Sequence, residues 1–218
     1  MVPWLDPRLP ISFPATSEAL ETPNGLLAAG GELSIEWLVS AYAQGIFPWF
    51  NEGEPILWWS PAPRTVLFPE AFRVNRSFRK HLKKSPYRVT VDLRFREVMQ
   101  ACAEPRAGQP GTWISRQMID AYYELHLAGY AHSYECWDKN NVMVGGLYGV
   151  ALGNVFFGES MFRRADYASR YCMKTLVESG HYQMIDCQMK TDHLINQGAQ
   201  EIEREKFEKL LGQYTGFS

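Results

Sequence analysis

Apolar positions cluster between residues 144 and 162 in two runs that predict a buried β-hairpin. Both runs are rich in β-branched and aromatic residues, and the turn-prone pair Gly153-Asn154 separates them. A single carboxylate, Glu159, interrupts the second run. Buried charges are rare unless they are paired, so Glu159 lies either at an exposed end of a core hairpin or at a functional site. Four glycines would let another backbone or a ligand approach closely: Gly145, Gly146, Gly149 and Gly158.

Periodic apolar positions on both sides of this hairpin predict a mixed α/β domain. The expected order is one strand, two helices and then three or more consecutive strands. A further helix, a short buried strand and two more helices follow. The predicted ranges are strands over 87–92, 131–137 and 183–188, and helices over 93–103, 168–179, 192–197 and 203–211, with a helix that Thr112 or Ser115 caps and Gly129 closes.

Two polar residues on the short strand extend the possible site. Asp186 and Gln188 are two positions apart, so on a regular strand they point to the same face. If this strand pairs beside the strand that carries Glu159, two carboxylates and an amide would meet above the sheet. Such a group can hold and deprotonate an amine. The alternative is structural: Asp186 caps a neighbouring element and Gln188 satisfies a backbone group.

Residues 1–63 differ in character and predict a small N-terminal domain, with a larger domain over 64–218. Proline, glycine and tryptophan are frequent there, which indicates an irregular lobe with short helices. One helix is clear, because Ser34 can cap it and Gly45 stops it. Three tryptophans fall within residues 49–59 between prolines, on stiff loops or edge strands. They either wall a pocket or pack the small lobe onto the large one.

A basic segment follows the domain boundary. Residues 71–91 contain no acidic side chain, and several basic positions recur at helical spacing until Pro86. This pattern favours binding of a polyanion such as a phosphate backbone, and the alternative is an ordinary solvated helix face. The positive charges are Arg73, Arg76, Arg79, Lys80, Lys83, Lys84 and Arg88.

Composition narrows the class of protein. The net charge of −2 over 218 residues excludes a generally basic nucleic-acid binder, so a polyanion must meet a local patch. The four cysteines form no C-x-x-C pair, which predicts free buried thiols. No spacing suggests zinc, and no Walker loop or G-x-G-x-x-G is present, so we expect neither metal nor cofactor. The first residues do not resemble a secretion signal, and no apolar run approaches 18 residues, so we expect a soluble cytoplasmic protein. A monomer is a separate expectation, on which these patterns do not bear.

Ordered sequence blocks resemble the leucyl/phenylalanyl-tRNA–protein transferase family. They run through nearly the whole chain and combine unusual tryptophan and glycine positions. The blocks are P-N-G-L-L-A-A-G-G-E-L-S from 23, A-Y-A-Q-G-I-F-P-W-F from 41, I-L-W-W-S-P-A-P-R from 56, G-T-W-I from 111, A-H-S-Y-E-C-W from 131, V-G-G-L-Y-G-V-A from 144, F-F-G-E-S-M-F from 156, I-D-C-Q from 185 and H-L-I-N-Q-G-A from 193.

The resemblance implies a large domain with the fold of the acetyl-coenzyme A-dependent N-acetyltransferases. It implies transfer of Leu, Phe or Met from aminoacyl-tRNA to the amine of a protein that begins with Arg or Lys, marking it for degradation under the N-end rule. Catalytic positions would be Asp186, Gln188 and Glu159, with their individual roles open. The apolar pocket for the donor side chain would be lined by Trp49, Trp113, Leu147, Phe156, Met161 and Leu176. The tRNA would meet Arg76, Arg79, Lys80, Lys83, Lys84 and Arg170.

Two positions depart from the family's usual F-S-R and A-S-K pattern. Arg163 follows Phe162, and Arg170 follows Ser169. Arg170 keeps a positive charge, although an Arg fork is not equivalent to an ammonium, and Arg163 adds charge near the expected acceptor entrance. Two other functions are alternatives. An acetyl-coenzyme A-dependent N-acetyltransferase needs a glycine-rich pyrophosphate loop, which we do not find. A non-catalytic RNA-binding module would leave Glu159, Asp186 and Gln188 without a role.

Overall fold

The computed structural model describes residues 2–84, 87–105 and 114–216 and contains two sheets. The helices are α1 (Ile35–Ala43), α2 (Arg76–Leu82), α3 (Phe95–Ala103), α4 (Arg116–Leu127), α5 (Ala168–Glu178), α6 (Asp192–Asn196) and α7 (Arg204–Thr215). The strands are β1 (Trp4–Leu5), β2 (Leu26–Gly30), β3 (Phe47–Pro48), β4 (Leu57–Trp59), β5 (Arg64–Leu67), β6 (Arg88–Val91), β7 (Ala131–Trp137), β8 (Met143–Leu152), β9 (Val155–Arg163), β10 (Met184–Gln188) and β11 (Gln200–Ile202).

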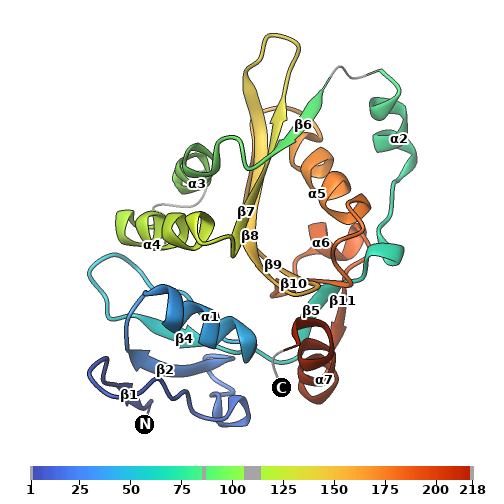
Figure 1. Cartoon of the computed structure of the whole chain (residues 1–218). Coiled ribbons are helices and arrows are strands. Elements are labelled where there is room, and N and C mark those ends of the chain that lie inside the picture. Colours follow the sequence, from blue (N-terminus) through green and yellow to red (C-terminus); the bar gives the residue numbers. More distant parts are fainter. Residues whose placement is uncertain (1, 85–86, 106–113, 217–218) are drawn as a thin grey trace.

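The larger sheet has the order β11-β5-β10-β9-β8-β7-β6. Strands β9 and β10 run parallel, whereas the other neighbours in this sheet are antiparallel. Helices α3 and α4 cover one face, and α5 covers the other (Figure 1). The mixed α/β class is therefore confirmed. The predicted hairpin is β8–β9, with Gly153 in the turn at φ +53°. Among the described residues, no helix is long and apolar enough to cross a membrane.

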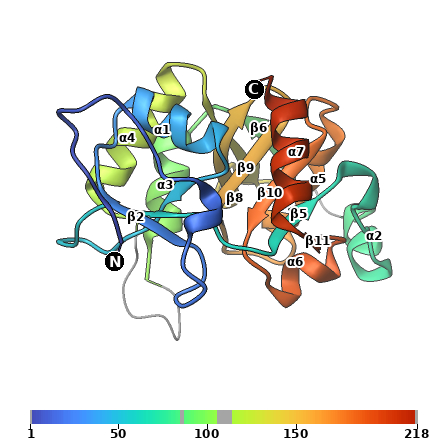
Figure 2. The same cartoon turned by 90° about the horizontal axis from the view of Figure 1, so that it is seen from below.

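The N-terminal residues form a second sheet with the order β1-β2-β4-β3. This regular sheet differs from the irregular lobe expected, because its strands are too short for a clear alternation and prolines interrupt the pattern. Helix α1 agrees with the prediction, and the Ser34 hydroxyl accepts a hydrogen bond from Trp37 N–H at its start. Helices α1 and α7 lie side by side where the small sheet meets the large one (Figures 1 and 2).

Two irregularities in the large sheet position the polar residues. The register of β9 against β8 shifts between Gly158 and Ser160, so Glu159 is an extra residue in its strand. Because of this bulge, Phe156 and Met161 belong to the same layer of side chains although they are five positions apart. Strand β10 has a second shift between Asp186 and Gln188. Bulges re-aim side chains locally, and here both lie at the centre of the sheet, on its parallel pair.

The hairpin glycines divide into two kinds. A Cβ at Gly145, Gly146 or Gly149 would meet other atoms of the protein at 2.1 to 2.7 Å, so the close approach there is made by the protein itself. At Gly158 the nearest atom would be the Asp186 carbonyl oxygen at 3.5 Å, and this glycine lines a cavity. Gly145, Gly146 and Gly149 therefore allow close approach of the protein's own atoms, whereas Gly158 leaves open space at a cavity.

Candidate functional site

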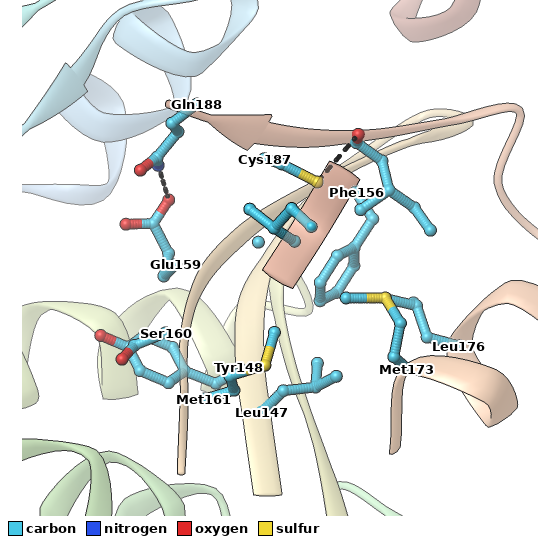
Figure 3. A pocket seen from close by; sticks show the side chains of 13 residues that line it. Leu147, Tyr148, Phe156, Glu159, Ser160, Met161, Met173, Leu176, Cys187 and Gln188 are labelled. Carbon is cyan, nitrogen blue, oxygen red and sulfur yellow. Dashed lines mark hydrogen bonds between the residues drawn. The ribbon is translucent and has the colours of Figure 1, made fainter. Parts of the chain in front are cut away.

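An apolar cavity of about 140 Å³ lies between α5 and the strands β8, β9 and β10. Helix α5 contributes Met173, and α6 closes the cavity with Leu194. A well-studied engineered apolar cavity of about 150 Å³ holds benzene, so this space suits a ring or a branched four-carbon side chain. Four of the predicted pocket residues line it: Leu147, Phe156, Met161 and Leu176 (Figure 3).

Polar groups lie at one end of this cavity. The Gln188 amide Nε2 donates a hydrogen bond to Glu159 Oε1 at 2.9 Å (Figure 3). On the other carboxylate oxygen, Tyr122 Oη donates to Glu159 Oε2 at 3.4 Å, and the hydroxyls of Tyr122 and Tyr42 are hydrogen-bonded to each other. Burial raises the pKa of both tyrosines, so they remain protonated donors. Glu159 is only 9% exposed, which excludes the alternative that it sits at an exposed end of the hairpin.

The surroundings of Glu159 change its proton affinity. Burial raises the pKa of its carboxyl to about 8, and the charge of nearby Asp186 adds to the increase. Hydrogen bonds from Tyr42 and Tyr122 and the charge of Arg64 oppose it. A carboxyl with a pKa near the working pH is suited to accept or return a proton during a reaction.

Asp186 lies beside this group but has different partners. It is fully buried, and Arg64 holds it with two hydrogen bonds, Nε to Oδ1 at 2.9 Å and Nη2 to Oδ2 at 2.7 Å. The backbone N–H of Gln188 also donates to Oδ1 at 2.9 Å. The structure thus brings Glu159, Asp186 and Gln188 together, although the register shift interrupts the regular alternation from which a shared face was expected.

Three residues that contact the predicted polar group were missed in the sequence: Arg64, Tyr42 and Tyr122. Two of them lie inside the blocks that carry the family resemblance, since Tyr42 belongs to A-Y-A-Q-G and Arg64 ends W-W-S-P-A-P-R. Membership of those blocks was the available signal. Tyr122 belongs to none of these blocks, and its buried position on α4 does not by itself distinguish core packing from a hydrogen bond to the site.

The tryptophans between residues 49 and 59 lie in different surroundings. Trp58 is fully buried in the core and donates from Nε1 to the Gly30 carbonyl at 2.8 Å. It therefore has a packing role, the second of the two alternatives expected for these tryptophans. Trp49 is 39% exposed and lines a second hollow of about 380 Å³ that shares Glu159 and Gln188 with the apolar cavity. The carbonyl of Trp49 accepts a bond from Trp59 Nε1 at 2.7 Å. Trp113 lies outside the described residues.

The basic segment forms a helix that is shorter than expected. Helix α2 has seven residues, and Asn75 caps it by accepting from Phe78 N–H at 2.9 Å. Pro86, expected to end it, lies outside the described residues. Five of the six expected tRNA contacts are exposed here: Arg76, Arg79, Lys80, Lys83 and Lys84. The sixth expected tRNA contact, Arg170, is buried instead, with its guanidinium over the Phe78 ring and a bond from Nη2 to the Arg73 carbonyl at 3.1 Å.

These features define a class of protein: a two-part α/β protein with an apolar cavity that has a carboxyl of raised pKa and an amide at its end. The family model described as leucyl/phenylalanyl-tRNA protein transferase matches residues 66–212, and the model of its N-terminal domain matches residues 31–62. The chain belongs to the leucyl/phenylalanyl-tRNA–protein transferase family.

Close relatives carry that name over almost their whole length. A transferase from Cellvibrio japonicus (strain Ueda107) is 57% identical over 99% of this chain and 92% of its own. Another, from Pseudomonas fluorescens (strain Pf0-1), is 54% identical over 98% and 95%. Among solved structures, FemX aligns at 12% identity with a TM-score of 0.44, over 82% of this chain and 65% of that one. The family membership therefore rests on the sequence relatives.

Proposed function

We propose that this protein transfers Leu or Phe, and also Met, from aminoacyl-tRNA to the α-amine of proteins that begin with Arg or Lys. The observation that carries the proposal is the apolar cavity that ends at the Glu159–Gln188 hydrogen bond. Its volume fits a leucine or phenylalanine side chain, and apolar pockets discriminate by about 1–3 kcal/mol per methylene. In this proposal residues 1–63 and 64–218 are two domains, and the hollow beside Trp49 admits the rest of the donor.

The chemistry asks for positioning and for removal of one proton. The acceptor nitrogen bonds to the ester carbonyl carbon, the bond from that carbon to the terminal ribose oxygen breaks, one amine proton leaves, and the ribose oxygen takes up one proton. The ester is already activated, so alignment and stabilisation of the oxyanion are the main requirements. Glu159 is the base in this proposal, because it borders both hollows and its carboxyl has a raised pKa.

The tRNA is proposed to meet the exposed face of α2. Arg76, Arg79 and Lys80 on α2, and Lys83 and Lys84 directly after it, are exposed, and exposed positive side chains attract phosphates through counterion release. Arg170 supports this surface from beneath, because it packs against Phe78 on the inner side of α2. A cellular consequence of the transfer is that the modified proteins are marked for degradation under the N-end rule.

The test is a transfer assay with radiolabelled Phe-tRNA or Leu-tRNA and the purified protein, without ATP or added metal. The acceptor is one protein prepared with N-terminal Arg, with N-terminal Gly and with an acetylated N-terminus. We expect incorporation only into the first. Absence of label at low salt, with the charged tRNA shown to be intact, contradicts the proposal, and equal labelling of the Gly protein contradicts the acceptor preference.

A further inference from the structure

The guanidinium of Arg64 occupies a closed space between the two parts of the chain. Its Cζ lies 5.0 Å from the ring centroid of Phe47, in the small sheet, and 4.7 Å from that of Phe207, in α7. The side chain is 1% exposed, and Nη1 has no hydrogen-bond partner among the residues that the structure describes. A buried ion pair with an unsatisfied donor is a poor source of stability, since desolvation offsets the attraction. The contact of the guanidinium with Asp186 explains the buried arginine better than a contribution to stability does.

The guanidinium holds Asp186 by both carboxylate oxygens. Arg64 Nε and the Gln188 backbone N–H donate to Oδ1, and Arg64 Nη2 donates to Oδ2. The two-point Arg–carboxylate contact also sets the plane of the carboxylate. Since Asp186 is fully buried and both of its oxygens have donors, it does not hold the acceptor amine. Its place is therefore in supporting the site and not in binding the acceptor.

Asp186 in turn holds the backbone of Gln188 in an unfavourable conformation. Gln188 has φ +62°, in the left-handed region that costs a non-glycine residue roughly 1–2 kcal/mol. It follows the register shift in β10, and its backbone N–H is the atom bonded to Asp186 Oδ1. From this backbone position the side chain reaches Glu159 Oε1 at 2.9 Å. The contacts therefore run in an unbroken series from the guanidinium to the carboxyl at the end of the cavity.

We propose that Arg64 is a positioning residue for aminoacyl transfer, which acts by fixing Asp186 and, through it, the backbone and amide of Gln188. This inference rests on the proposed function. Arg64 is buried and lines neither hollow, so in this proposal it acts on the site only through Asp186. Its effect is therefore on the rate of transfer and not on the affinity for the donor.

The test compares Arg64→Lys with a matched variant, Arg204→Lys. Arg204 lies in the same junction and donates to the Ser60 carbonyl at 2.9 Å and to its hydroxyl at 3.0 Å, but it touches none of the three polar site residues. Lysine keeps the charge at position 64 but cannot make the two-point contact. We expect kcat of Arg64→Lys to fall about 10- to 100-fold, the range for one charged hydrogen bond, with KM for aminoacyl-tRNA within about twofold. Arg204→Lys is expected to keep kcat.

Two further measurements separate positioning from a loss of folding. Asp186→Asn keeps Arg64 and should lower kcat by a similar factor. The kcat of the double variant should be no lower than that of the less active single variant, because both changes break the same series of contacts. In crystal structures of Arg64→Lys and Asp186→Asn, the distance from Gln188 Nε2 to Glu159 Oε1 should exceed roughly 3.5 Å, the limit of a hydrogen bond.

Retention of kcat by Arg64→Lys, whatever its melting temperature, overturns the proposal. So does an unchanged Gln188–Glu159 distance in both variant structures, or a full additive loss in the double variant. If the wild-type protein transfers nothing, the proposed function fails. The crystallographic distance still decides in that case whether Arg64 holds Gln188 in place.

Discussion

Gln188 and Glu159 lie on the parallel strands β10 and β9 and meet through a hydrogen bond of 2.9 Å at the end of the apolar cavity. Each residue belongs to a site where the strand register shifts. A regular pair of strands would not aim these two side chains at each other in this way. The apolar cavity, the amide and the carboxyl therefore lie together, and the predictions below test their proposed roles.

The first prediction concerns Glu159 as the proton acceptor. Glu159→Gln should lower kcat by about 10²- to 10⁴-fold, the usual contribution of a general base. In the wild type, the rate should rise with pH up to about 8, where the pKa of this carboxyl lies. An acceptor α-amine titrates near 8 as well. The pH dependence of the residual activity of Glu159→Gln distinguishes the two groups. If its pH profile is identical to that of the wild type, the rise belongs to the amine and not to Glu159.

The same carboxyl should make stability depend on pH. Between about pH 4.5, its ordinary pKa, and about pH 8 the native state binds a proton that the unfolded state has released, so the free energy of unfolding falls as pH rises. The expected slope approaches about 1.4 kcal/mol per pH unit. Urea unfolding at pH 5.5 and pH 8 measures it. Glu159→Gln should flatten this dependence, and a slope equal to that of the wild type would contradict the assigned pKa.

Tyr122 should influence the proton affinity of Glu159. Its hydroxyl donates to the carboxylate and is hydrogen-bonded to that of Tyr42. Hydrogen bonds from both tyrosines to Glu159 favour the charged form of its carboxyl. Tyr122→Phe should therefore raise the pKa of Glu159 and move the pH–rate profile to higher pH. The control is Tyr148→Phe, because the buried Tyr148 hydroxyl has no hydrogen-bond partner among the described residues. Equal displacement of the profile in both variants would assign the effect to packing.

Leu147 should help to select the donor. Leu147→Ala enlarges the cavity and should change the ratio of Phe to Leu transfer, by a factor that reflects about 1–3 kcal/mol per methylene. Leu152→Ala is the matched control, because Leu152 lies on the same strand, is equally buried at 2% exposure, and belongs to the other face. Both variants should lose about 2–5 kcal/mol of stability. The donor ratio, measured with mixed charged tRNAs, should change only in the first.

The surface of α2 should determine the salt dependence of tRNA binding. Replacing Arg76 and Lys83 with Gln should weaken binding and reduce the slope of log affinity against log salt by about 1 for each phosphate that is no longer neutralised. Filter binding between low and moderate salt measures this slope. Arg116 and Lys206, also exposed, provide a control pair on α4 and α7. Loss of binding in the control pair alone would place the tRNA on another surface.

Local sequence patterns were enough for most of the individual elements. Ser34 is the predicted cap of α1, and Thr112 or Ser115 that of α4. The hydroxyls of Ser34 and Ser115 accept from the N–H three residues later, so Ser115 is the cap of α4. The Gly153-Asn154 pair predicted the turn of the β8–β9 hairpin. These features depend on neighbours within a few residues, which the sequence displays directly. The small N-terminal sheet was not predicted, because strands of two to five residues carry too little alternation.

The sequence by itself determined the helices, the hairpin, the family and the polar residues Glu159, Asp186 and Gln188. Tertiary structure alone decided how those residues are used. Arg64 and Asp186 are 122 positions apart, and their contact exists only because β5 pairs with β10. The bulges that aim Glu159 and Gln188 arise from the register that neighbouring strands impose on each other. Register follows from packing over the whole sheet, so no local pattern in the chain reveals it.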